Sequence, residues 1–244
     1  MRGATPAGAR GEQEAARWVR AMFGRVAPTY DLLNHLLSLN VDRWWRARAA
    51  RRVRDILRRP GARVLDICCG TGDLLLVLER ERGAPVMGSD FCRPMLESAA
   101  AKIARRGGGS ALFAADALRL PLRAGSLDLI TAAFGFRNLV NYRRGLAEMR
   151  RVLRPGGVAA ILEFSTPPNA VLRGIYYFYS AHLLPRLGGI VSGSRDAYDY
   201  LPESVRKFPG AEELAGEMRA AGFRQVEFER MTGGIVTLHV GTVS

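Results

Sequence analysis

Three aspartates that follow apolar segments are the residues of this sequence best placed to bind a ligand. Asp66 lies in "VLDICCGTGD" (64–73), Asp90 ends "PVMGSD", and Asp116 ends "ALFAAD". The carboxyl ends of parallel strands meet at one edge of an open α/β sheet, and ligands bind in the crevice outside that edge. As neighbouring strands, the three segments would bring their carboxylates together in a negatively charged crevice.

The charge of this crevice indicates the class of ligand. It disfavours a pyrophosphate and suits a cation. Asp90 follows Asp66 by 24 residues, close to the spacing of about 20 at which a carboxylate binds a ribose diol in nucleotide-binding sheets. A sulfonium cofactor with an adenosine group therefore fits the crevice better than NAD does.

The turn after the first predicted strand contains Gly70 and Gly72, with Thr71 between them. A glycine-bearing turn that opens a helix exposes backbone N–H groups where a ligand can approach closely. Cys68 stands where such loops usually have their first glycine, and its Cβ predicts an ordinary negative φ there. Asp66 has a second interpretation, in which it only organises the turn.

A further polar pair follows the predicted strand 127–134, where the sequence reads "FGFRN" (134–138). In one interpretation the strand delivers Arg137 and Asn138 to the ligand crevice. In the other, Arg137 pairs with a helix terminus or a carboxylate.

Other conspicuous residues have plainer interpretations. Cys69 is expected to pack as a small residue, because no histidine lies nearby in its motif to activate the thiol. His35, on a leucine-rich helix, is either a core or interface histidine or a catalytic base. Trp44 and Trp45 are expected to seal a layer of N-terminal helices, unless one of them lines a channel.

The segments that must position these residues alternate between two patterns. Short apolar segments that read as strands are separated by helical patterns of about 10–15 residues, which predicts a mostly parallel sheet with helices on both faces. The predicted strands are 62–69, 85–91, 111–116, 127–134, 158–165, 225–231 and 235–241, and the predicted helices of the core include 73–82, 93–106, 142–153 and 210–221. The fold class is therefore α/β and Rossmann-like.

The same patterns divide the chain into regions. We expect a flexible tail (1–14), an N-terminal helical cap (15–59), a cofactor-binding Rossmann-like core (60–169), a helical insertion (170–208), and a C-terminal helix with strands that complete the core (209–244). The insertion begins with an aromatic helix predicted over about 170–186. Insertions at the carboxyl edge of an open sheet commonly bind substrate.

Composition limits the partners. The 244 residues carry a formal charge of +13, and all basic residues except Lys102 and Lys207 are arginines. Such a charge suits nucleic acid, an anionic membrane face or an acidic substrate, but it is scattered, and no motif of a nucleic-acid-binding module accompanies it. We therefore expect no nucleic-acid partner, and the charge is either functional or a consequence of arginine-rich composition.

The cysteines and the apolar segments indicate a cytoplasmic protein. Cys68, Cys69 and Cys92 form neither a disulfide framework nor a zinc-binding pattern, so we expect a reducing compartment and no metal. No signal peptide is evident at the N-terminus. The most apolar segment, 175–191, contains a histidine, a proline and an arginine, so it is expected to lie on a membrane surface and not to span the bilayer.

Taken together, the motifs resemble a known family. Residues 62–165 are similar to the class I S-adenosylmethionine-dependent methyltransferases, which have a seven-stranded sheet. From about residue 18 to residue 241 the chain resembles the ubiquinone/menaquinone biosynthesis C-methyltransferases, with more similarity to their demethylmenaquinone branch. The blocks that carry this resemblance are "MFGRVAPTYDLLNHLLSLNVDRWWR" (22–46), "FGFRN", "EMRRVLRPGG" (148–157), "LEFSTP" (162–167), "YDYLPESVRKFP" (198–209) and "GGIVTLHVG" (233–241).

The resemblance implies a reaction and its partners. S-adenosylmethionine would donate a methyl group to a ring carbon of a reduced polyprenyl naphthoquinol, in the last step of menaquinone biosynthesis. The alternative is a polyprenyl methoxybenzoquinol of ubiquinone biosynthesis; an RNA methyltransferase and a non-catalytic scaffold of a quinone-biosynthesis complex are less favoured. Transient contact with the cytoplasmic membrane face is implied, and a homodimer is compatible with the sequence.

The resemblance also implies roles for residues. Gly70, Thr71 and Gly72 would approach the cofactor, Asp90 would bind its ribose hydroxyls, and Asp116 with Ala117 would contact its adenine. Arg137 would hold a developing phenolate or orient a water, Asn138 would donate a hydrogen bond nearby, and Tyr30 would face the acceptor ring. Ala133 stands where the family often has a small polar residue, so no contact is expected from it.

Overall fold

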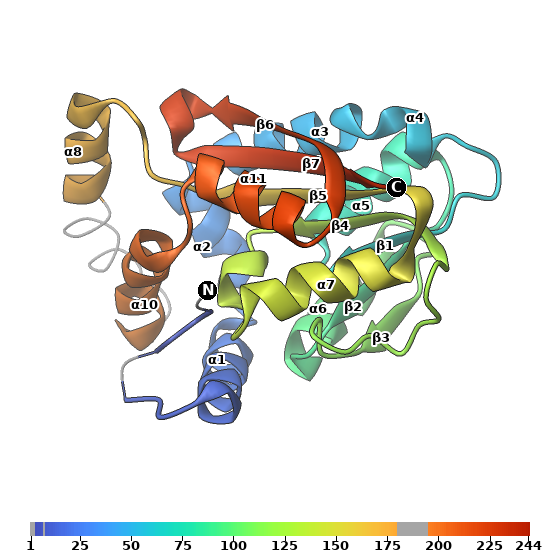
Figure 1. The fold of residues 1–244 in the computed structure, drawn as a ribbon. Coiled ribbons are helices and arrows are strands. Elements are labelled where there is room, and N and C mark those ends of the chain that lie inside the picture. Colours follow the sequence, from blue (N-terminus) through green and yellow to red (C-terminus); the bar gives the residue numbers. More distant parts are fainter. Residues whose placement is uncertain (1–2, 7, 180–194) are drawn as a thin grey trace.

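A computed structural model of the chain describes residues 3–6, 8–179 and 195–244. It contains one seven-stranded sheet in the order β3-β2-β1-β4-β5-β7-β6 (Figure 1), in which only β7 is antiparallel to its neighbours. The strands are β1 (Val64–Ile67), β2 (Met87–Asp90), β3 (Leu112–Ala114), β4 (Leu127–Ala133), β5 (Leu153–Phe164), β6 (Phe223–Met231) and β7 (Val236–Val243). The predicted α/β fold is confirmed.

The strand order reverses between β1 and β4. From β1 the chain adds β2 and then β3 on one side, whereas β4 and β5 lie on the other. Ligands of open α/β sheets bind at this switch point, outside the carboxyl ends of the strands. Both the glycine loop after β1 and the "FGFRN" segment after β4 begin there.

Helices cover both faces of the sheet. On one face lie α7 (Tyr142–Val152) and α11 (Ala211–Ala220), and on the other α5 (Asp73–Arg82) and α6 (Arg93–Arg105). Two apolar cores result, because successive side chains of a strand point to opposite faces. In β5, Ile161 belongs to the core under α7 and α11, and Leu162 belongs to the core on the side of α5.

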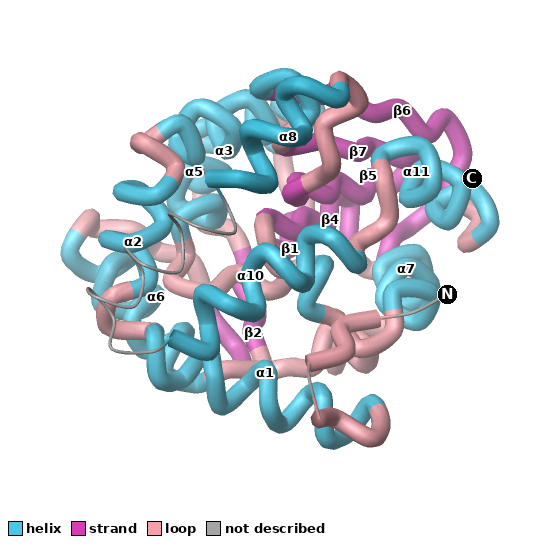
Figure 2. The backbone as a smooth tube through the Cα atoms, turned by 90° about the vertical axis from the view of Figure 1, so that its left-hand side faces the viewer, coloured by secondary structure: helices cyan, strands magenta, loops and turns pink. Residues whose placement is uncertain are grey.

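The predicted N-terminal cap forms two parts. The helices α1 (Glu12–Val26) and α2 (Tyr30–Leu37) lie in front of the carboxyl edge of the sheet, where α10 (Arg195–Lys207) runs beside α1 (Figure 2). The helices α3 (Val41–Arg52) and α4 (Arg54–Leu57) instead pack on α5, since α3 and α4 bury apolar residues in the core of that face.

The predicted tail (1–14) overlaps the first helix by three residues, because α1 begins at Glu12. Upstream of that helix, Ala4 is buried and its N–H donates to the carbonyl oxygen of Leu139 at 2.7 Å. The N-terminal segment is thus fixed beside the polypeptide that follows "FGFRN".

The insertion is described only at its two ends. The helix α8 (Ala170–Phe178) is capped by the Asn169 side chain, which accepts from two backbone N–H groups of its first turn. The second half of the predicted aromatic helix, with His182 and the following glycine-rich loop, lies in residues 180–194, outside the described residues. Within the described ranges, no helix has the length and apolar character needed to cross a bilayer.

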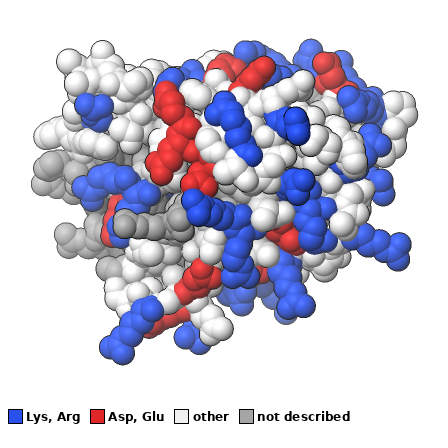
Figure 3. Space-filling model, in the orientation of Figure 1, with Lys and Arg blue, Asp and Glu red and all other residues white. Residues whose placement is uncertain are grey.

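Charge is dispersed over the face shown in Figure 3. Basic side chains lie among acidic and uncharged ones and do not form a stripe. Several are paired across elements, as in Arg143 with Glu217, Arg144 with Glu12 and Arg230 with Glu212. Uncharged residues dominate the upper left of this view, over α8.

Candidate active site

The glycine loop has a backbone conformation that corrects one prediction. Gly70 and Gly72 have φ values of 53° and 85°, and Cys68 also has a positive φ, 49°. The ordinary φ predicted for Cys68 is therefore wrong. The residue opposite is Gly135, where an added Cβ would lie 2.4 Å from the Cβ of Cys68. Gly135 of "FGFRN" thus leaves the space that a side chain at Cys68 requires.

Asp90 ties this loop to the end of β2. Its two carboxylate oxygens accept from the backbone N–H of Gly70 at 2.9 Å and of Cys92 at 2.8 Å. Burial raises the pKa of this carboxyl group, against the lowering effect of these hydrogen bonds. A Cβ at Gly70 would meet no atom within 4 Å, so a ligand can approach the backbone there.

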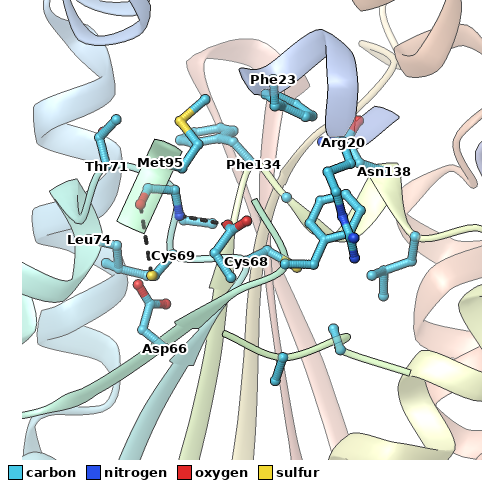
Figure 4. A pocket seen from close by; sticks show the side chains of 18 of the residues that line it. Arg20, Phe23, Asp66, Cys68, Cys69, Thr71, Leu74, Met95, Phe134 and Asn138 are labelled. Carbon is cyan, nitrogen blue, oxygen red and sulfur yellow. Dashed lines mark hydrogen bonds between the residues drawn. The ribbon is translucent and has the colours of Figure 1, made fainter. Parts of the chain in front are cut away.

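One cavity is lined by all the residues predicted to bind the cofactor except Gly72, which directly precedes α5. Asp116 is exposed at its rim, accepts from the N–H of Leu118 at 2.9 Å, and stands next to the buried Ala117. Figure 4 shows the cavity with Asp66, Cys68, Cys69 and Thr71 on one side and Asn138 on the other. Arg20 and Phe23 enter from α1, and the sequence had not indicated them.

A second, larger cavity adjoins the first. Its volume is about 310 Å³, and its largely apolar wall is rich in aromatic rings, so we call it the aromatic cavity. Its side chains include residues of α1, α2, α3, α8 and α10. Four residues line both cavities: Phe23, Tyr30, Arg46 and Phe134. The arrangement provides one chamber at the glycine loop and a second, apolar chamber that meets it at these four side chains.

Arg137 lines the second cavity and is 5% exposed. Its Nη1 lies 2.9 Å from Oε1 of Glu163, which is fully buried, and also donates to the carbonyl oxygen of Phe134. Its Nε donates to Ser204 at 3.3 Å. The carboxylate pairing considered from the sequence is therefore present. A guanidinium has five N–H donors, so this pairing is compatible with a role toward a ligand.

The other two predicted catalytic residues lie close by but differ in orientation. Asn138 lines the first cavity, and its Oδ1 accepts from the hydroxyl of Tyr200 at 3.1 Å. Tyr30 lines both cavities, and burial raises the pKa of its phenol. The short helix Phe136–Asn138 thus presents adjacent residues to two different chambers.

A charged network behind these cavities was missed from the sequence. Arg46 is buried, lines both cavities, contacts the Asp42 carboxylate and lies 3.6 Å from Asp73. Lys102 lies 2.6 Å from both Asp73 and Asp31. The participants come from four helices, α2, α3, α5 and α6, and their spacing in the chain gives no signal of this convergence.

His35 belongs to the same network. Its Nδ1 lies 2.8 Å from Asp42, and its Nε2 lies 3.7 Å from Asp73. Among the described residues, these three form the group of possible metal ligands. Arg46 and Lys102 already neutralise both carboxylates, so the group suits a cation poorly. The expectation of no metal remains a prediction.

Asp66 points across the sheet and not along its turn. Its carboxylate accepts from the hydroxyl of Thr131 on β4 at 2.6 Å. Burial raises its pKa to about 7, while the hydrogen bond from Thr131 and the charge of Arg46 act in the opposite direction. Asp66 is therefore partly protonated near neutral pH, in the wall of the first cavity.

Solved structures share this fold at low sequence identity. A Thermotoga maritima S-adenosylmethionine-dependent methyltransferase covers 93% of this chain and 100% of its own, with a TM-score of 0.67 and 20% identity. The [4+2]-cyclase SpnF covers 98% and 99%, with a TM-score of 0.65 and 17% identity. These similarities establish the methyltransferase fold and nothing about the acceptor.

Sequence relatives are much closer. A demethylmenaquinone methyltransferase of Thermus thermophilus is 48% identical over 90% of this chain and 99% of its own length. One of Deinococcus radiodurans is 46% identical over 94% of each, and a ubiquinone/menaquinone biosynthesis C-methyltransferase of Geobacter sp. is 44% identical over 94% and 97%. The model of one family matches residues 10–243. The chain belongs to the ubiE/COQ5 methyltransferase family.

Proposed function

We propose that this methyltransferase transfers a methyl group from S-adenosylmethionine to a ring carbon of a reduced polyprenyl naphthoquinol, converting demethylmenaquinol to menaquinol. The observation that carries the proposal is the pair of adjoining cavities, one at the glycine loop and one aromatic. The names of the most similar relatives favour the naphthoquinol over the benzoquinol of ubiquinone biosynthesis.

The first cavity suits the methyl donor. The open backbone at Gly70 and the carboxylate of Asp90 are suited to an adenosine and its ribose hydroxyls, and Asp116 with Ala117 to the adenine. When bound, S-adenosylmethionine supplies an electrophilic methyl group on a positively charged sulfur. The carboxylates of Asp90 and Asp116 in the wall favour that charge.

The second cavity suits the acceptor. A quinol, unlike a quinone, pushes electron density onto the ring carbon, whose electron pair forms the new bond to the methyl carbon while the pair of the carbon–sulfur bond stays on sulfur. The hydroxyl beside that carbon gives up its proton to solvent as the bond forms. The carbon then loses its own proton and the hydroxyl is restored, so that one proton is released overall. Arg137 stabilises the phenolate that develops on the adjacent oxygen. Tyr30 orients the ring at the junction of the cavities, and Asn138 hydrogen-bonds nearby from the side of the first cavity.

The identity of the acceptor is tested by competition between two rings. With labelled S-adenosylmethionine and equal amounts of demethylmenaquinol and the demethylated benzoquinol, we expect label predominantly in the naphthoquinol. Oxidised quinones serve as the control and should gain no label. Preferential labelling of the benzoquinol would assign the enzyme to ubiquinone biosynthesis. If neither compound gained label, the proposal would be wrong, and a non-catalytic role or methylation of RNA would be favoured.

An insoluble isoprenoid tail requires contact with a membrane, and we assign that contact to the cytoplasmic face through α2, α8 and the start of α3. Large apolar side chains are exposed on these elements: Leu32, Leu36, Leu39, Trp44, Val171 and Ile175. Leu39, in the turn between α2 and α3, is 81% exposed and also lines the aromatic cavity, so its side chain connects the surface with the chamber. Exposed apolar patches of this kind mark membrane or protein contacts.

Leu39 offers a clean test of that contact. Its φ is 52°, a conformation that asparagine tolerates better than leucine. Leu39→Asn should therefore preserve thermal stability. It should also lower co-flotation with anionic liposomes at low salt about threefold or more, since it removes a leucine side chain that would be buried in the membrane. Gln225→Asn, at a second positive-φ position (47°) on β6, is the matched control. Unchanged flotation of Leu39→Asn, or dimers of the wild type that mask this surface, would contradict the assignment.

A further inference from the structure

Two buried arginines face the aromatic cavity, and only one of them has been given a role. Arg46 is 6% exposed and Arg137 is 5% exposed, and both side chains line this chamber. Neither guanidinium can lose its proton, so each places a permanent positive charge in an apolar site. An acceptor that is bound there meets two such charges.

The two arginines stack on two neighbouring aromatic rings of the chamber, which we call its aromatic floor. Phe134 and Phe164 pack with their ring centroids 4.8 Å apart. The guanidinium of Arg46 lies over Phe134, 5.2 Å from its centroid, and that of Arg137 lies over Phe164 at 5.4 Å. Each arginine is thus stacked on its own ring of one contiguous pair.

The positions of both guanidinium groups are fixed by carboxylates. Glu163 holds Arg137. Asp42 holds Arg46 and is itself held by Ser38 at 2.7 Å and by His35 at 2.8 Å. Side chains fixed in this way are preorganised to donate hydrogen bonds without rearrangement when a ligand binds.

The electrostatics of Tyr30 indicate that the charges of Arg46 and Arg137 act on the same part of the cavity. The positive charges of Arg137 and of Arg46 oppose the rise in the pKa of the Tyr30 phenol that burial causes. The hydroxyl therefore lies within electrostatic range of both guanidinium groups. An oxygen atom of a ligand bound next to Tyr30 would lie within the same range.

We propose that Arg46 and Arg137 bind the two para oxygens of the quinol, Arg137 the oxygen beside the methylated carbon and Arg46 the opposite one. This inference rests on the proposed quinol substrate, although not on the choice between naphthoquinol and benzoquinol, because both carry 1,4-oxygens. Arg46 is then a specificity residue that selects a dihydroxylated ring and fixes its orientation toward the methyl donor.

The test pairs an enzyme variant with a substrate analogue. The analogue is a prenylated 1-naphthol that keeps the hydroxyl beside the methylated carbon and lacks the opposite one. For the wild-type enzyme, kcat/KM should be about 10- to 100-fold lower with the analogue than with the quinol, the range of one hydrogen bond to a charged group. Arg46→Met should lose a similar factor with the quinol and little or nothing with the analogue.

Two companion variants separate recognition from folding. Arg46→Met leaves the buried Asp42 with Ser38 and His35 but without its arginine partner. The combination Arg46→Met with Asp42→Asn also removes the carboxylate, and it should likewise lose activity with the quinol and little with the analogue. Arg46→Lys keeps the charge and should recover part of that loss. Asp55→Asn, an exposed aspartate on α4, is the control for the aspartate change.

The outcomes are distinct. Equal losses of Arg46→Met on quinol and analogue would overturn the inference. So would a weakened affinity of the variant for S-adenosylmethionine without a change in acceptor selectivity, because Arg46 also lines the first cavity. A wild-type enzyme that methylates neither compound would instead overturn the proposed function.

Discussion

Arg137→Ala should lose nearly all turnover and also about 3–5 kcal/mol of unfolding free energy, because it removes one partner of a buried ion pair. Glu163 is fully buried and would be left with no guanidinium beside it. Activity loss in this variant alone therefore does not distinguish catalysis from folding.

A double variant separates the two effects. In Arg137→Gln with Glu163→Gln no charge is left uncompensated. The amide oxygen at 163 can still accept from one of the two backbone N–H groups, of residues 137 and 164, that the two oxygens of Glu163 now satisfy at 3.1 and 2.9 Å. We expect urea unfolding to recover most of the lost free energy while turnover stays at least about 100-fold down, since removing one donor to a developing oxyanion typically costs 10²–10³ in kcat.

Cofactor affinity provides the second readout for Arg137. The residue lines the acceptor chamber and not the cavity at the glycine loop, so the dissociation constant for S-adenosylmethionine should change little in the double variant. Recovery of turnover together with stability would show that Arg137 is structural. An equal loss of turnover and cofactor affinity would also remove the catalytic assignment.

Asp90→Ala should weaken binding of S-adenosylmethionine about 100-fold, equivalent to roughly 3 kcal/mol. The carboxylate is expected to bind the ribose hydroxyls, and it also holds the N–H groups of Gly70 and Cys92. Its removal therefore deletes a charged acceptor and releases the loop that the cofactor contacts. Isothermal titration calorimetry of variants whose thermal stability has been measured gives the dissociation constants.

Two further substitutions calibrate this result. Asp116 is exposed at the rim of the same cavity, and solvent screens its interactions, so Asp116→Asn should weaken binding less than about tenfold. Asp55→Asn should leave it unchanged. If Asp90→Ala binds the cofactor as tightly as the wild type does, or if Asp116→Asn has the larger effect, the assignment of the ribose to Asp90 is wrong.

Local sequence patterns were sufficient for the sheet and for much of the first cavity. Strand 127–134 was predicted and β4 is Leu127–Ala133, because a continuous apolar segment between turn residues is typical of a parallel strand buried on both faces. The loop at Gly70 and Gly72 was likewise predicted from adjacent residues. The end of the tail was placed three residues too late, since Glu12, the first residue of α1, contacts Asn141 and Arg144, which are distant in the chain.

Contacts between distant residues decided the remaining features of the site. The positive φ of Cys68 depends on Gly135, which is 67 positions away, so the loop pattern alone gave the wrong conformation. The pairing of β4 with β5 decided that Glu163 is the partner of Arg137. The sequence offers many other carboxylates that could have formed this ion pair.

The sequence by itself determined the class of fold, the edge of the sheet at which ligands bind and the family to which the chain belongs. Each of these follows from short segments whose meaning depends on adjacent residues: apolar strands, a glycine turn and carboxylates at strand ends. The tertiary structure alone decided that "FGFRN" presents Arg137 and Asn138 to different chambers, and that Arg46 faces Arg137 across an aromatic floor. Such relationships arise when α1, α2 and α3 pack on the sheet, because side-chain packing brings together residues whose separation in the chain carries no signal.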